Sequence, residues 1–102
     1  MQVFVVCWGC ASNDDDGNNI ANANVHGVYA SKEAARVGLV ECKDGWVNEV
    51  TNNPDFDEEE ADYAKVNCCV YGSVEDDYFE IDYADCDTFN EVRIELVIKE
   101  LV

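Results

Sequence analysis

The stretch VHGVYASKEAARVGLVECKDG, residues 25–45, decides the fold, because a strand pattern passes directly into a helix pattern. The run from Val25 to Tyr29 predicts a strand, and Ser31 is suited to cap the N-terminus of a helix. Apolar residues then recur at helical spacing, at Ala35, Leu39 and Cys42. We expect Gly38 to mark close packing on a sheet, and Gly45 to end the helix.

Two segments precede this junction. QVFVVCW, residues 2–8, is apolar at alternating positions on both faces, which predicts a central strand buried on both sides. Residues 12–24 are polar and rich in Asn, Asp and Gly, which indicates a long loop.

Three segments after the helix also favour strands. YAKVNCCVYGS, residues 63–73, and YFEIDYA, residues 78–84, resemble a hairpin joined through VEDD. EVRIELVIK, residues 91–99, has apolar residues at every second position, which favours a strand over a helix. The acidic run after Pro54 is compatible with either a short helix or a loop.

These elements predict a single acidic α+β domain over residues 1–102, with an antiparallel or mixed sheet of about five strands and one main helix packed on it. Glu80 and Asp82 should be exposed on the side of their strand opposite the core. The residues expected to be buried are Val3, Val5, Leu39, Phe79, Ile81, Ile94 and Leu96.

The charge is unusual for a chain of this length, with 23 acidic residues against 6 basic ones and a net charge of −17. Residues 55–91 hold fourteen acids and only Lys65 as a base. Such self-repulsion destabilises a compact state and repels nucleic acid and anionic membranes, so basic proteins are the expected partners. Because residues 1–10 have no basic leader and no apolar run is long enough to span a membrane, we expect a cytoplasmic protein.

The segment VHGVYASKEAARVGL is similar to a pattern in small uncharacterised phage and bacterial proteins. The matching residues are Gly27, Val28, Tyr29, Ser31, Glu33 and Ala34. This resemblance covers roughly residues 2–45 and implies a fold and a phage or bacterial origin, but no activity. In size and charge the whole chain also resembles phage-encoded DNA mimics, such as anti-restriction and anti-CRISPR proteins, which would place it in the host cytoplasm.

Two interpretations of the acids remain open: a solvated surface without mimicry, and an anionic face that occupies the nucleic-acid groove of a basic nucleic-acid-binding protein. We favour the second, because Glu80 and Asp82 would stand about 6.7 Å apart on a rigid strand, and neighbouring acids would extend the row. The residues expected to form this face are Asp55, Asp57, Glu58, Glu59, Glu60, Asp62, Glu75, Asp76, Asp77, Glu80, Asp82, Asp85 and Asp87, with Tyr63, Tyr71 and Tyr78 as aromatic contacts.

The six cysteines have a different set of interpretations. We expect most of them to be small buried hydrophobic residues in a reducing cell. The alternative function is a zinc-binding module, in which Cys7 and Cys10 bind one ion together with His26 or Cys86. With one histidine and no nucleophile or phosphate-binding motif, the chain is not expected to be an enzyme or to use a cofactor.

Overall fold

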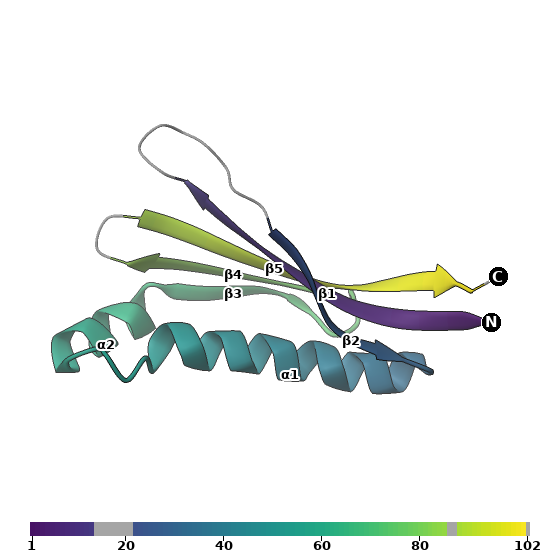
Figure 1. Cartoon of the computed structure of the whole chain (residues 1–102). Coiled ribbons are helices and arrows are strands. Elements are labelled where there is room, and N and C mark those ends of the chain that lie inside the picture. The colour runs from purple at the N-terminus through teal and green to yellow at the C-terminus, as the bar shows by residue number, and fades with distance from the viewer. Residues whose placement is uncertain (14–21, 86–87, 102) are drawn as a thin grey trace.

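Five antiparallel strands and two helices form an α+β fold in the computed structural model, which describes residues 1–13, 22–85 and 88–101 (Figure 1). The sheet order is β2-β1-β5-β4-β3. The predicted fold class is confirmed. The elements are β1 (Gln2–Asn13), β2 (Asn22–Tyr29), α1 (Lys32–Thr51), α2 (Glu58–Val66), β3 (Cys68–Ser73), β4 (Tyr78–Asp85) and β5 (Thr88–Glu100).

Both helices lie along one side of the sheet, and no element among the described residues covers the other side (Figure 1). In β1, Val6 is buried beneath the helices, with Phe4 and Trp8 packed around the same core. Val3 and Val5 point to the open side and are only half-buried. The prediction that this strand is buried on both sides is therefore wrong, because a single helical layer leaves the second face open.

Helix α1 begins as predicted but extends further than predicted. The Ser31 hydroxyl accepts a hydrogen bond from the Ala34 amide at 3.2 Å, which confirms the N-cap. The helix passes through Gly45, which was expected to end it, and stops at Thr51. Trp46 and Val50 in this last part pack against the core. Such packing outweighs the roughly 1 kcal/mol that a glycine costs within a helix.

Close packing at Gly38 is confirmed. This residue is buried, and a Cβ atom placed on it would overlap the hydroxyl and ring of Tyr29 from β2. Gly27 in β2 lies under the same ring, where an added Cβ would be 2.7 Å from the hydroxyl. The two glycines thus allow the Tyr29 ring to lie between α1 and the sheet.

The hairpin is confirmed for β3 and β4, but it starts later than predicted. Residues 63–66 belong to α2 rather than to a strand. The strand β5 is also confirmed and pairs with both β1 and β4. At the other end of the chain, the residues expected to form a loop at 12–13 and 22–24 belong to β1 and β2, and residues 14–21 lie outside the described part.

The core lies between α1 and the sheet. Of the residues predicted to be buried, Leu39, Phe79, Ile81 and Ile94 are confirmed. Leu96 is half-buried, because β5 continues beyond the well-covered part of the sheet. No helix in the described residues has the length and apolar character needed to cross a bilayer. The fully or nearly buried hydrophobic residues are Val6, Ala35, Leu39, Cys42, Ala64, Phe79, Ile81, Val92 and Ile94.

Candidate functional site: the acidic surfaces

The acids predicted to form one continuous face are distributed over three places. Those of residues 55–62 lie on α2 and the segment leading into it, within the helical layer. Glu75, Asp76 and Asp77 lie in the turn between β3 and β4. Glu80 and Asp82 point to the open side of the sheet, since Phe79 and Ile81 on the same strand face the core. The strand register therefore divides the expected row. Asp87 and the side chain of Asp85 lie outside the described part of the chain.

The first surface, called here the α2 surface, consists of the six carboxylates at Asp55, Asp57, Glu58, Glu59, Glu60 and Asp62. All six residues are exposed. Within the described residues, none of these carboxylates has a cationic group within 4.0 Å. The one base on this helix, Lys65, lies in its last turn. The α2 surface therefore carries uncompensated negative charge.

Local physics explains why these residues form a helix. Asp57 is the N-cap, and its Oδ1 accepts a hydrogen bond from the Glu60 amide at 2.8 Å. Glu58 and Glu59 follow in the first turn, where negative charge interacts favourably with the helix dipole. An acidic residue followed three positions later by Glu is a start signal that could have been found in the sequence. Capping thus accounts for part of the acidic run, but not for Asp55 or Asp62.

The second place is the turn between β3 and β4, where Asp77 has a structural role. Its Oδ1 lies 2.9 Å from Arg36 Nε and its Oδ2 lies 3.4 Å from Lys32 Nζ. Burial alone would raise the pKa of Asp77, but the hydrogen bonds and charges of Arg36 and Lys32 outweigh burial and lower it. Its φ is +56°, a conformation that Asp tolerates better than most residues. Asp77 joins the turn to α1, and its negative charge is already compensated by cations of the chain.

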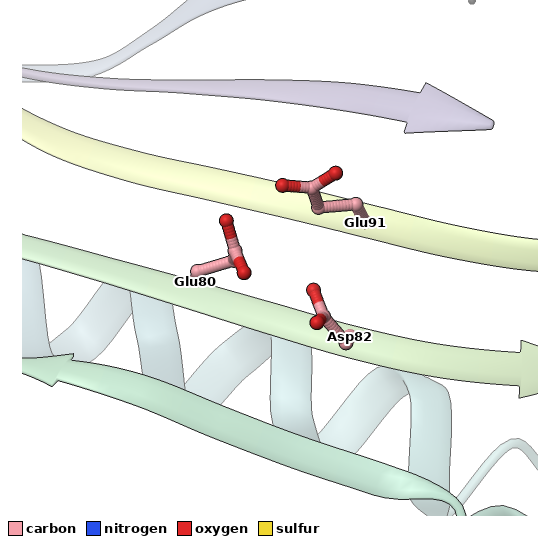
Figure 2. Close-up of side chains that lie close together, drawn as sticks. All are labelled: Glu80, Asp82 and Glu91. Carbon is pink, nitrogen blue, oxygen red and sulfur yellow. The ribbon is translucent and has the colours of Figure 1, made fainter.

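The third place is the open side of the sheet, where Glu80, Asp82 and Glu91 form a carboxylate cluster (Figure 2). One oxygen from each lies within 4.8 Å of the others. All three residues are half-buried, so the prediction that Glu80 and Asp82 are simply exposed is wrong. The reason is the pairing of β4 with β5, which sets Asp82 directly opposite Glu91 and Glu80 opposite Arg93.

One cation partly neutralises the carboxylate cluster. Arg93 Nε lies 2.7 Å from Glu91 Oε1 and 3.5 Å from Glu80 Oε1. Tyr78 is half-buried, and its hydroxyl donates a hydrogen bond to Glu80 at 3.1 Å. Tyr78 is therefore engaged within the protein. Asp82 Oδ1 is buried and has no hydrogen-bond partner.

The pKa values of Glu80 and Glu91 are shifted in opposite directions. A shared hydrogen bond with Glu91, then burial and nearby negative charge, raises the pKa of Glu80. The same hydrogen bond, together with Arg93, lowers the pKa of Glu91. On acidification Glu80 is therefore protonated before Glu91. Its O–H group then donates a hydrogen bond to the Glu91 carboxylate.

The carboxylate cluster is the group of described residues whose oxygen atoms could hold a divalent cation such as Ca²⁺ or Mg²⁺. Arg93 already forms ion pairs with two of its members, Glu80 and Glu91, and would compete with such an ion. Sequence reasoning missed Glu91 and Arg93 as part of this group. Their spacing of two residues on a strand placed them on one face, but only the pairing with β4 shows which acids they meet.

Cys7 and Cys10 do not have the arrangement that the zinc-binding alternative requires. Cys7 and Cys10 both lie within β1, so Trp8 and Gly9 do not form the turn that shared coordination requires. Cys7 points to the open side and Cys10 packs toward the core. His26 is exposed in β2, and Cys86 lies outside the described residues.

Burial of the cysteines is also less than predicted. Of the five described cysteines, only Cys42 is fully buried, and burial raises its pKa to about 11. Cys69 is exposed, because it alternates with Cys68 along β3 and faces the open side.

Of the tyrosines expected to make partner contacts, Tyr63 on α2 is 48% exposed and Tyr71 on the open side of β3 is 53% exposed. Only Tyr63 stands beside the α2 surface.

Comparison of the chain with protein-family models, with curated proteins and with solved structures finds no match. The resemblance to phage-encoded DNA mimics therefore stays a prediction.

Proposed function

We propose that the protein is a small acidic inhibitor, of the phage-encoded DNA-mimic or anti-CRISPR kind, whose α2 surface occupies the nucleic-acid-binding groove of a basic protein. The observation that carries the proposal is the set of six exposed carboxylates at residues 55–62, with no cationic group within 4.0 Å among the described residues. Uncompensated charge on a rigid element attracts an oppositely charged groove and accelerates association.

The spacing of these carboxylates supports mimicry of a phosphate backbone. Glu58 and Asp62 are one helical turn apart on the same side of α2, which separates them by about 6 Å along the axis. Two phosphate steps along one strand of DNA cover about 6.8 Å of the helix axis. Tyr63, next to Asp62, offers an exposed ring of the type that makes interfaces specific.

At the other two acidic places, the charge of Asp77 and of the carboxylate cluster is compensated at least in part by cations of the protein itself. Asp77 is held by Lys32 and Arg36, and the carboxylate cluster on the open side is partly neutralised by Arg93. A partner would have to displace these internal cations to use the same carboxylates. Glu75 and Asp76 in the turn are also exposed and have no cationic group within 4.0 Å among the described residues, but they are two acids, whereas the α2 surface has six. We therefore assign the partner contact to α2.

The experiment compares two variants with the same change in charge. The α2 variant carries Asp55→Asn, Glu58→Gln, Glu59→Gln and Asp62→Asn, and keeps Asp57, whose carboxylate caps α2 by accepting from the backbone amide of Glu60. The control variant carries Glu33→Gln, Glu41→Gln, Glu75→Gln and Glu95→Gln, all exposed positions elsewhere. Each protein is immobilised, and nucleic-acid-binding proteins retained from a bacterial lysate are eluted with duplex DNA.

We expect DNA to elute the partner from the wild type and from the control variant, and the α2 variant to retain none. Raising the salt from about 50 to 200 mM should also release the partner, because exposed charges are screened. Equal losses in both variants would mean that net charge alone causes retention. The surface would then be a solvated acidic one without mimicry.

A further inference from the structure

The helical layer contains a pocket of about 600 Å³ between the C-terminal half of α1, helix α2 and strand β4. Aromatic side chains form much of its wall, namely Trp46, Phe56, Tyr63 and Tyr83. Its volume lies within the range of about 300–1,000 Å³ that small-molecule sites occupy. Neither the hydrophobic pattern nor the charge pattern of the sequence indicated this pocket, because its wall depends on how α1 and α2 pack together and against Tyr83 of β4.

Three glutamates also line the pocket: Glu49 from α1, and Glu59 and Glu60 from α2. All three are exposed, so they stand at the mouth rather than in the interior. Among the ten lining residues, all within the described chain, none is Lys, Arg or His. The pocket therefore combines aromatic walls with a negatively charged rim.

This combination selects a class of ligand. An organic anion would be repelled by the rim, and a strongly hydrated inorganic cation gains little from apolar walls. A neutral apolar molecule would fill the pocket but would make no use of the rim. A cation with an apolar body uses both, since aromatic faces attract cations and carboxylates attract them further.

The wall is also partly fixed before any ligand arrives. Trp46 packs edge-on against Trp8 of β1, with ring centroids 4.9 Å apart. Ala64, which is 7% exposed, lines the pocket from α2. A preformed wall reduces the ordering that binding would otherwise require.

We propose that this pocket is a binding site for an organic cation with an apolar body, such as an alkylated or aryl-bearing ammonium. The site goes beyond the inhibitory role of the α2 surface and does not depend on it. Glu59 belongs to both, so a bound cation would neutralise charge at one edge of the α2 surface.

The test uses benzyltrimethylammonium as the probe, with benzyl alcohol as a neutral analogue and benzoate as an anionic one. Binding is followed by NMR shifts of backbone amides at constant ionic strength. We expect saturable shifts confined to residues 46–64 and the neighbouring part of β4. The ammonium should bind roughly tenfold more tightly than benzyl alcohol, because exposed carboxylates and aromatic faces add to burial. Benzoate should cause no saturable shift.

Two matched variants locate the charges that matter. The rim variant carries Glu49→Gln, Glu59→Gln and Glu60→Gln. The control variant, with the same charge change, carries Glu58→Gln, Asp62→Asn and Glu95→Gln, none of which lines the pocket. The rim variant should lose roughly tenfold in affinity for the ammonium and little for benzyl alcohol, and the control should lose less than about threefold.

A third variant, Tyr63→Leu, keeps an apolar side chain but removes one ring. It should weaken binding of the ammonium roughly two- to fivefold and leave benzyl alcohol nearly unchanged. Three results would overturn the proposal. These are benzyl alcohol binding as tightly as the ammonium, shifts that centre elsewhere on the protein, and equal losses in the rim and control variants.

Discussion

Replacing Glu80 with Gln should stabilise the protein, although it removes a partner of Arg93. Glu80 belongs to the carboxylate cluster with Asp82 and Glu91, and one oxygen from each of the three lies within 4.8 Å of the others. At a separation of 4.8 Å, two like unit charges repel by about 0.9 kcal/mol in bulk water, and by more where screening is weaker. The substitution removes two such repulsions.

Three further effects decide the size of the change. The lost attraction to Arg93 at 3.5 Å offsets part of the gain, although Arg93 keeps its closer contact with Glu91 at 2.7 Å. The amide of Gln can donate to Glu91, as a protonated Glu80 would. Its oxygen can still accept from the Tyr78 hydroxyl. We expect a net gain of about 1 kcal/mol in the free energy of unfolding at pH 7, or roughly 4 °C in Tm for a domain of this size.

The pH dependence gives a second signature of the same pair. Because the pKa of Glu80 is raised in the folded state, its protonated form stabilises the fold, and that stability is lost as pH rises through the folded pKa. Glu80→Gln should therefore gain most at neutral pH and little at acidic pH. Urea unfolding at several pH values measures this, with Glu95→Gln as the control, since Glu95 is exposed on β5 outside the cluster. A loss of stability at pH 7 would mean that the Glu80–Arg93 attraction outweighs the repulsion within the carboxylate cluster.

Three other outcomes are expected. Gly38→Ala should destabilise the protein by about 1 kcal/mol, because overlap with the Tyr29 ring outweighs the helix propensity gained, and should become stabilising in a Tyr29→Ala background. Asp77→Asn should cost about 1 kcal/mol at neutral pH. Because the folded pKa of Asp77 is lowered, this difference should begin to shrink below about pH 4 and disappear as pH falls through the folded pKa, and a constant difference would contradict it. A metal chelator should leave Tm unchanged, since Cys7 and Cys10 face opposite sides of β1, and stoichiometric zinc in the purified protein would contradict this.

The fold class could be predicted because local patterns agreed with the final packing. Alternation at Phe79 and Ile81, and again at Val92 and Ile94, identified the core face of two strands that pair with each other. The Ser31 cap marked the start of α1 because capping is a local interaction. The end of the helix was missed because the packing of residues 46–51 depends on distant strands.

The candidate site could be predicted only in composition. The sequence shows how many acids there are, but which of them meet a cation depends on contacts between distant residues. Arg36 reaches Asp77 from 41 positions away, and Arg93 reaches Glu80 from the neighbouring strand. Those contacts separate the compensated acids from the α2 surface. The open second face of the sheet was missed for a related reason, since apolar Val3 and Val5 give no sign of which side the helices cover.

The most direct test of the proposed function is competition between the protein and duplex DNA for one purified partner. Isothermal titration of that partner is carried out with and without saturating DNA, using the wild type, the α2 variant and the control variant. We expect DNA to abolish binding of the wild type and of the control variant, and the α2 variant not to bind at all. A ternary complex of partner, DNA and protein, or full binding by the α2 variant, would contradict it.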